Sequence, residues 1–316
     1  MPYLSTLKTL TFGTGSTCIP CDLPDSPPVV QDWTPGNAYL GGFAERPDRP
    51  ASKYFYLPGV VFDFTGQNAD ATAVELGPIF QAAGLLEVAT SKAGYSLGDP
   101  HFTSGDVSAG DCVPIATVKY NRNGQLWQGS KCVTDLVLSF VAGEIPTVTA
   151  DFTGQLAAAD WPTADTIGTV TATASAAAPW QGATITGGTL LAGAMIRNLI
   201  VSIGNRVKVR KDPTGPWGYG PPCLSAPRKT RSRALIEVPI LAALSSAEYK
   251  AATGTQVSLG WKYSAGTGTN KVATFTMTGY LQAWPDMPDE DGLAMYSLDI
   301  GQNPTSGSLS WLYGAT

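Results

Sequence analysis

The chain has 316 residues, a formal net charge of −5 and a charged fraction of 14%, below the roughly 25% usual for globular domains. The acidic balance argues against a general nucleic-acid-binding protein, because such a protein needs a basic face to displace counterions. So few charges are compatible with a surface that is buried against other subunits and equally with a β-protein solvated by its hydroxyl groups.

Apolar and polar residues alternate along much of the chain, and turn residues are abundant, with 35 Gly and 24 Pro. This pattern predicts a mainly β protein. In chain order, the expected strands are Thr6–Phe12, Gly59–Phe64, Cys132–Phe140, Thr147–Leu156, Ala194–Val209, Ala234–Ile240, Gln256–Tyr263, Lys271–Ala283 and Ala294–Ile300. Two short helices are expected, one at Ala73–Ala83 with Pro78 in its first turn and one at Ser245–Ala252 with a capping box.

The expected elements occur twice in the same order: strand, loop, strand, helix and two further strands. Residues 147–154 and 272–279 align on a shared Thr-Gly pair, and each has one hydroxyl- or acid-bearing face and one apolar face. Any two amphipathic strands look alike, but the repeated order of elements favours a duplication. We therefore expect a first domain over 1–165, an Ala/Thr-rich linker over 166–182 and a second domain over 183–316.

Few residues could support catalysis or metal binding. His101 is the single histidine, so a Ser-His-Asp or Cys-His site would have to use it, and a zinc site with two histidines is impossible. Cys18 and Cys21 have C-x-x-C spacing, but neither a thioredoxin-like βαβ unit nor a second ligand pair accompanies them. The five cysteines, odd in number and sparse, indicate folding with reduced thiols. We expect no enzyme activity, no cofactor and no metal site.

Basic residues are concentrated between Asn205 and Arg233, where we expect a long loop stiffened by prolines and without secondary structure of its own. Such loops are usually functional. Contact with nucleic acid and docking on an acidic neighbour are both open. Docking is favoured because the chain carries its own acidic patch, which head-to-tail stacking would bring against the basic loop. The candidate docking residues are Arg206, Lys208, Arg210, Lys211, Arg228, Lys229, Arg231, Arg233, Asp286, Asp289, Glu290 and Asp291.

The stretch from Lys131 to Gly154 resembles the paired strands of phage tail tube proteins, in which a strand ending in a Gly-Glu turn leads into a Thr-rich strand. Four other features fit the same family: the turn at 121–124, the strand at 194–209, the helix after Pro239 and the closing segment 289–300. The likeness covers most of 59–300. The long N-terminal loop at 13–58 and the apparent duplication depart from the family.

The resemblance implies two tandem tail-tube-like β-sandwich or barrel domains, each with one short flanking helix. Six such domains commonly form a ring, so two per chain imply a trimer with pseudo-six-fold symmetry rather than a hexamer. Rings would assemble in the bacterial cytoplasm and stack into a virion tail tube that contacts other tail proteins. DNA would pass transiently and without sequence specificity, and no membrane partner is implied.

The lumen-facing candidates are Thr147, Thr149, Asp151, Thr274 and Thr276, because hydroxyls and carboxylates would not hold phosphates. A tail terminator, a capsid accessory protein or an adhesin is the alternative function. A carbohydrate-binding or hydrolytic β-protein, suggested by eight Trp and 12 Tyr, is a further alternative.

Overall fold

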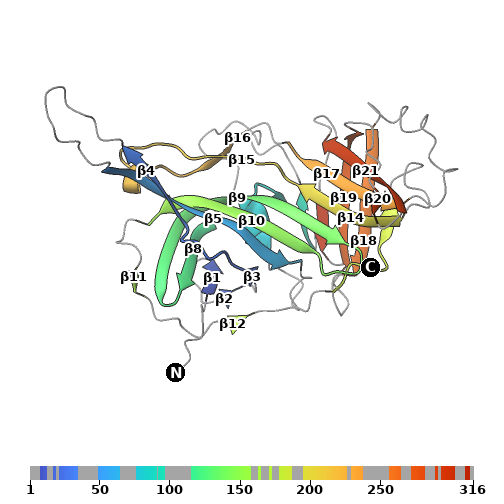
Figure 1. Cartoon of the computed structure of the whole chain (residues 1–316), viewed down its shortest axis with the longest axis horizontal. Helices are drawn as coiled ribbons and strands as arrows, with labels where there is room; N and C mark the ends of the chain where they lie inside the picture. Colours follow the sequence, from blue (N-terminus) through green and yellow to red (C-terminus); the bar gives the residue numbers. More distant parts are fainter. Residues whose placement is uncertain are drawn as a thin grey trace.

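The computed structural model describes residues 8–12, 17–18, 21–34, 49–64, 76–90, 92–96, 115–157, 163–164, 171–172, 178–186, 195–225, 229–237, 256–264, 272–281, 289–290, 293–302 and 310–313. The protein is mainly β, as predicted, and most of its strands belong to one large sheet (Figure 1). The one α-helix in this part of the chain is α1 (Gly77–Ala82), which begins with Pro78 in its first turn as expected. The second expected helix, at 245–252, lies outside the described residues.

The expected strands are present, with altered bounds. β10 (Thr147–Leu156) has the predicted limits. Four other strands begin and end within two residues of their predicted limits: β1 (Lys8–Phe12), β18 (Gln256–Ser264), β19 (Val272–Leu281) and β21 (Leu293–Gln302). Three others begin before their predicted starts: β5 (Arg49–Asp63), β9 (Gln125–Val141) and β17 (Arg231–Glu237). The strand expected at 194–209 is wrong as a single element. It divides into β14 (Met195–Ser202) and β15 (Arg206–Lys208), because Gly204 between them has a φ of 69°.

The remaining strands have two to eight residues each. They are β2 (Thr17–Cys18), β3 (Cys21–Asp22), β4 (Val29–Thr34), β6 (Leu86–Thr90), β7 (Lys92–Ser96), β8 (Ile115–Arg122), β11 (Thr163–Ala164), β12 (Thr171–Ala172), β13 (Thr184–Thr186), β16 (Cys223–Ser225), β20 (Asp289–Glu290) and β22 (Ser310–Tyr313).

Six antiparallel strands form the central part of the sheet, in the order β5–β10–β9–β14–β17–β21. Because directly paired residues point to the same face of a sheet, the register defines two faces. One cross-strand row on the inner face is fully buried and consists of Phe62, Val148, Leu138, Val201, Ser232 and Ile300. This face supplies much of the hydrophobic core.

A second layer made by β1, β8 and α1 covers the inner face of β5, β10 and β9. Phe12 on β1 packs against Phe62 and Phe152, with ring centroids 6.3 and 5.8 Å apart. Ile79 and Phe80 on α1 are fully buried in the same core. Figure 1 shows β1 and β8 on one side of β5 and β10, so this part of the molecule is a sandwich of two layers.

β9 turns a corner that joins the two layers. Its first half pairs with β8, and its second half pairs with β14 on the same edge. The register with β10 shifts at the corner, where Lys131 adopts a φ of 50°. A Cβ on Gly154 would lie 2.3 Å from the Cys132 sulfur, so the strands approach closely here only because this residue is glycine.

The same strand order occurs in both parts of the chain. The run β8–β9–β10–β5 has its counterpart in β18–β19–β21–β17, and every pairing in both runs is antiparallel. By its place in this order β19 corresponds to β9, whereas the aligned sequences match 272–279 to β10, so the duplication stays a prediction. Two separate domains are not confirmed, because β14 pairs with both β9 and β17 and makes the sheet continuous across them. Two parts of the predicted linker, 166–182, are held against the first part of the chain. β12 pairs with β2, and the buried Trp180 forms main-chain hydrogen bonds with the β9–β10 turn.

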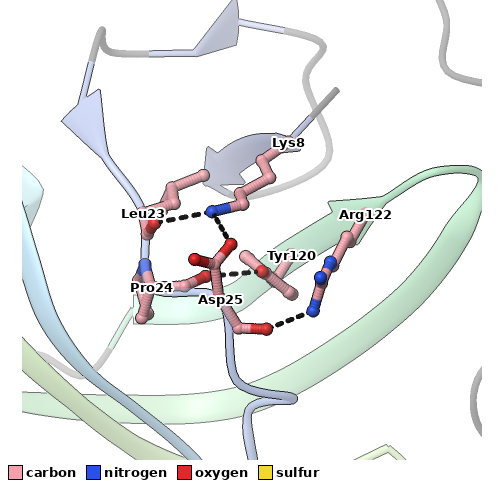
Figure 2. Close-up of polar contacts among 6 residues, drawn as sticks. All are labelled: Lys8, Leu23, Pro24, Asp25, Tyr120 and Arg122. Carbon is pink, nitrogen blue, oxygen red and sulfur yellow. Dashed lines mark hydrogen bonds and ion pairs between the residues drawn. The ribbon is translucent and has the colours of Figure 1, made fainter. Parts of the chain in front are cut away.

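Polar side chains hold residues 23–25 against β1 and β8 (Figure 2). Lys8 Nζ donates to Leu23 O at 3.0 Å and lies 2.5 Å from a carboxylate oxygen of Asp25. Tyr120 Oη donates to Pro24 O at 2.8 Å, and Arg122 donates to the main-chain oxygen of Asp25. Three consecutive carbonyl groups that lie outside any strand are thereby satisfied by side-chain donors.

The ion pair between Lys8 and Asp25 should make stability depend on pH. The hydrogen bond from Lys8 and its positive charge hold the pKa of Asp25 below its usual range. The carboxylate therefore stabilises the folded state above the unfolded pKa of about 3.9, and this contribution is lost as pH falls through the lower folded pKa. We expect Asp25→Asn to be less stable than the wild type in urea at pH 7 and equally stable at pH 2. An equal difference at both pH values would contradict this role.

Candidate functional site: the polar face and the cationic arm

The outer face of the six-stranded sheet is mostly polar, and we call it the polar face. Its cross-strand rows alternate with the buried rows of the inner face, and their side chains are exposed or half-buried. The first row consists of Asp63, Thr147, Ser139, Ile200, Arg233 and Asp299; the second consists of Val61, Thr149, Val137, Ser202 and Arg231. Hydroxyl and charged groups thus span six strands, on both sides of the predicted linker.

Three of the five lumen candidates lie on β10. Thr147 and Thr149 are half-buried members of the polar face, as the alternation predicts. Asp151 is also half-buried, but its carboxylate accepts a 2.7 Å hydrogen bond from the N–H of Gly59, which has a φ of 65°. This carboxylate therefore also holds the irregular part of β5, where the register with β10 shifts.

The other two lumen candidates lie outside the six central strands. Thr274 and Thr276 belong to β19, opposite Lys262 and Gly260 of β18, and their second neighbours are on β22. The register nevertheless continues the second row of the polar face onto β19, because Tyr280 lies opposite Gly301 and Gly301 lies opposite Arg231. Positions 274 and 276 have the same parity as Tyr280, so they fall on the same sheet face as Thr149.

Two cations also lie on the polar face. Their presence there does not follow from the alternation of β10 alone. Arg231 and Arg233 are exposed on β17, and one Arg231 Nη lies 3.9 Å from an Asp299 carboxylate oxygen. The sequence predicts a loop for both residues. The strand order that places them beside Ser202 and Ile200 cannot be predicted from a single strand. The face is consequently a mixture of hydroxyls, acids and arginines, with Val61, Val137 and Ile200 among them.

The loop expected over 205–233 is wrong for the most part, because the segment folds into an arm with its own structure. We call residues 205–225 the cationic arm. β15 pairs with β16 in a two-stranded ribbon, Lys211 bridges Tyr219, and a short 3₁₀ turn at Pro216–Gly218 forms the tip. The alternation of cationic and apolar residues at 206–209 belongs to the strand predicted at 194–209, whereas the prolines at 213–222 obscured β16 and the turn.

Asn205 anchors the root of the arm on β9. Its side-chain amide donates to Ala83 O at 2.8 Å and to Thr134 O at 3.1 Å, and its main-chain N–H donates to Asp135 at 2.8 Å. The adjacent Ile203 N–H donates to Leu136 O at 2.9 Å. Asn205 thus occupies the edge of β9 between the parts that pair with β8 and β14, and joins three elements.

The tip of the arm rests on the first part of the sheet (Figure 1). The Tyr219 ring packs edge-on against Tyr54 at 5.2 Å, and the Tyr219 carbonyl accepts a 2.9 Å hydrogen bond from Gln155. The Trp217 indole donates to Ala157 O at 3.3 Å, and Lys53 Nζ lies 4.8 Å from its ring. Anchored at both ends, the arm has a defined position, and its Arg206, Lys208, Arg210 and Lys211 side chains are exposed.

Several other predicted residues cannot be placed against the arm. Asp289 and Glu290 form β20, which pairs with β21. Arg228, Asp286 and Asp291 lie outside the described residues, as does His101. The docking of the basic residues on an acidic patch therefore stays a prediction.

The described residues hold no group of three or more His, Cys, Asp or Glu side chains that could bind a metal ion. Cys21 is half-buried on β3, and the side chain of Cys18 is not among those described. Cys132 is fully buried, and burial raises the pKa of its thiol far above the usual range.

Cys132 should resist alkylation in the folded protein, because the thiolate is the reactive form and burial suppresses it. With maleimide at pH 8, peptide mass spectrometry should find Cys132 modified only after unfolding in urea. The half-buried Cys223 serves as the comparison within the same chain. Modification of Cys132 in the native protein would contradict the closed corner between β9 and β10.

An open groove of about 600 Å³ lies where the β9–β10 turn meets β14 and β17. Its lining includes Trp180, the exposed Met195 and the ion pair between Arg197 and Glu237, whose N–O distance is 3.1 Å. This lining has no Ser, Cys or His.

No model of a known protein family matches the chain, and no curated protein matches it. No helix in the described part of the chain is long and apolar enough to cross a membrane.

Proposed function

We propose that this chain is a structural subunit of a phage tail tube, in which copies form rings and the rings stack around a channel for DNA. The observation that carries the proposal is the polar face, which continues over six strands while the opposite face is buried. A wall segment of a water-filled channel needs such a sheet, with one solvated face and a core behind it.

A ring also accounts for the breadth of the sheet. Open sheet edges present unpaired N–H and C=O groups that invite uncontrolled pairing, and closure into a barrel removes these edges. The low charged fraction of the chain is consistent with a surface that is largely covered by neighbouring copies. In this arrangement Thr147, Thr149, Ser139 and Ser202 would face the channel.

The repeated strand order supports a ring of three chains. The runs β8–β9–β10–β5 and β18–β19–β21–β17 would each supply one of six similar positions. Three chains then give pseudo-six-fold symmetry, whereas six chains would give twelve positions.

Negative-stain electron microscopy of the purified protein tests this proposal. We expect rings or stacked tubes with three-fold symmetry, and their formation should increase with protein concentration. Small compact oligomers that never stack would contradict the tube and would favour a terminator, a capsid accessory protein or an adhesin. Ring images with six-fold symmetry, together with a measured mass of six chains per ring, would contradict the trimer but not the tube.

A further inference from the structure

Six exposed cations lie in two short segments, one that contains β15 and one that leads into β17. In residues 229–233 every second side chain is cationic and exposed, and those between are buried. In residues 206–210 the cations are again exposed and the two valines between them are half-buried. Because side chains alternate along a strand, each set of three lies on one side of its strand. We call the six the cationic track: Lys229, Arg231, Arg233, Arg206, Lys208 and Arg210.

The two sets of three meet at the root of the arm. The main-chain N–H of Lys229 donates to Gly204 O at 3.2 Å, and Thr230 Oγ1 donates to Ile203 O at 2.9 Å. Arg206 follows Gly204 by two residues, next to the anchoring side chain of Asn205. The two segments therefore meet at the root of the arm, and four of the six cations lie on strands: Arg206 and Lys208 on β15, and Arg231 and Arg233 on β17.

The local charge of the track is opposite to that of the chain. The two segments of the track, 206–210 and 229–233, contain six cations and no acid, for a charge of +6, while the whole chain carries −5 and the remainder therefore −11. Asp299 contacts the track near Arg231, and Asp135 is engaged by the N–H of Asn205. Acids more than about 10 Å away are largely screened at 0.1 M salt, so the local charge decides what can bind.

We propose that the cationic track binds the phosphate backbone of nucleic acid without sequence specificity. Within each set, the cations repeat about every 6.6 Å, twice the rise of a strand residue, and so form a line of charge rather than a pocket. Specific protein interfaces are enriched in aromatic residues at their centre, and neither 206–210 nor 229–233 contains an aromatic residue; the apolar side chains of 206–210 are two half-buried valines. Exposed, regularly spaced cations instead suit contacts that release counterions.

The inference goes beyond the tube and does not depend on it. If the chain does form a tube, Arg231 and Arg233 would reach the channel from the polar face. Contacts with phosphate that carry no sequence preference allow DNA to slide, so weak binding and passage are compatible.

Fluorescence anisotropy with a labelled 20-bp duplex tests the track between 50 and 200 mM KCl. If all six cations contact phosphates, the affinity should fall about 10³-fold over this range, with a slope of log K against log salt of about −5. Absence of binding at 50 mM would overturn the proposal.

Paired substitutions locate the binding. Arg206→Gln with Lys208→Gln should reduce the magnitude of the salt slope by about 2. The matched control, Lys119→Gln with Lys131→Asn, removes the same charge from β8 and β9, and the asparagine tolerates the positive φ of position 131. The control should keep the wild-type slope. If the two pairs of substitutions changed the salt slope equally, the proposed track would be overturned. It would also be overturned if the protein bound poly-glutamate through these cations but did not bind the duplex. That result would instead indicate docking on an acidic protein.

Discussion

Replacing Gly204 with alanine should lower the free energy of unfolding by about 3 kcal/mol, measured by urea denaturation. Two costs combine at this position. A φ of 69° costs a residue with a Cβ about 1–2 kcal/mol, and the added Cβ would lie 2.3 Å from the Lys229 carbonyl oxygen. That carbonyl is part of the main chain that is bonded to Gly204 itself, so it cannot move away without breaking the junction of β17 and the arm.

Gly143→Ala is the matched control for this change. Gly143 has a φ of 82°, but no atom lies within 4 Å of the position that its Cβ would occupy. Only the conformational cost remains, and we expect a loss of about 1–2 kcal/mol. Equal losses for the two variants would show that the close approach at the root of the arm does not exist.

Replacing Asn205 with aspartate should be more damaging than replacing it with alanine. Alanine leaves the buried carbonyls of Ala83 and Thr134 without their donor, at about 1–3 kcal/mol for each group. Aspartate adds a buried carboxylate that faces both carbonyls and lies close to Asp135, whose oxygen already accepts the N–H of residue 205. We therefore expect a loss of about 3 kcal/mol for Asn205→Ala and a larger loss for Asn205→Asp.

The pH dependence of the aspartate variant gives a second test. Because a buried carboxylate beside another acid is most costly when both are ionised, the defect should diminish as the pH is lowered from 7 to 4. Aspartate and alanine variants of equal stability at pH 7 would contradict the donor role of the Asn205 amide.

Much of the fold follows from periodicity that is visible in the sequence. The alternation of polar and apolar residues in 147–156 predicts the limits of β10, and Pro78 predicts the first turn of α1. The start of β5 was missed because Pro50 and Pro58 look like strand breakers, although β5 accommodates both, with Pro58 beside its bulge. The break between β14 and β15 was missed because a single glycine in an alternating segment does not reveal a positive φ.

The site was less predictable than the strands, because it depends on which strands pair. Thr147 and Thr149 could be placed on a polar face from the alternation of one strand. Arg231 and Arg233 join that face only through β14, which pairs with β9 on one edge and β17 on the other. Long-range pairing of this kind is set by packing across the whole sheet and leaves no local signal in the residues of either strand.

The position of the polar face within an assembled particle tests the central claim most directly. A cryo-electron microscopy reconstruction of the assembled protein should place Thr147, Thr149, Ser139 and Ser202 on the wall of a continuous channel, with the buried face of the sheet directed outward. A reconstruction in which these side chains lie on the outer surface, or are buried between neighbouring copies, would contradict the proposed tube wall.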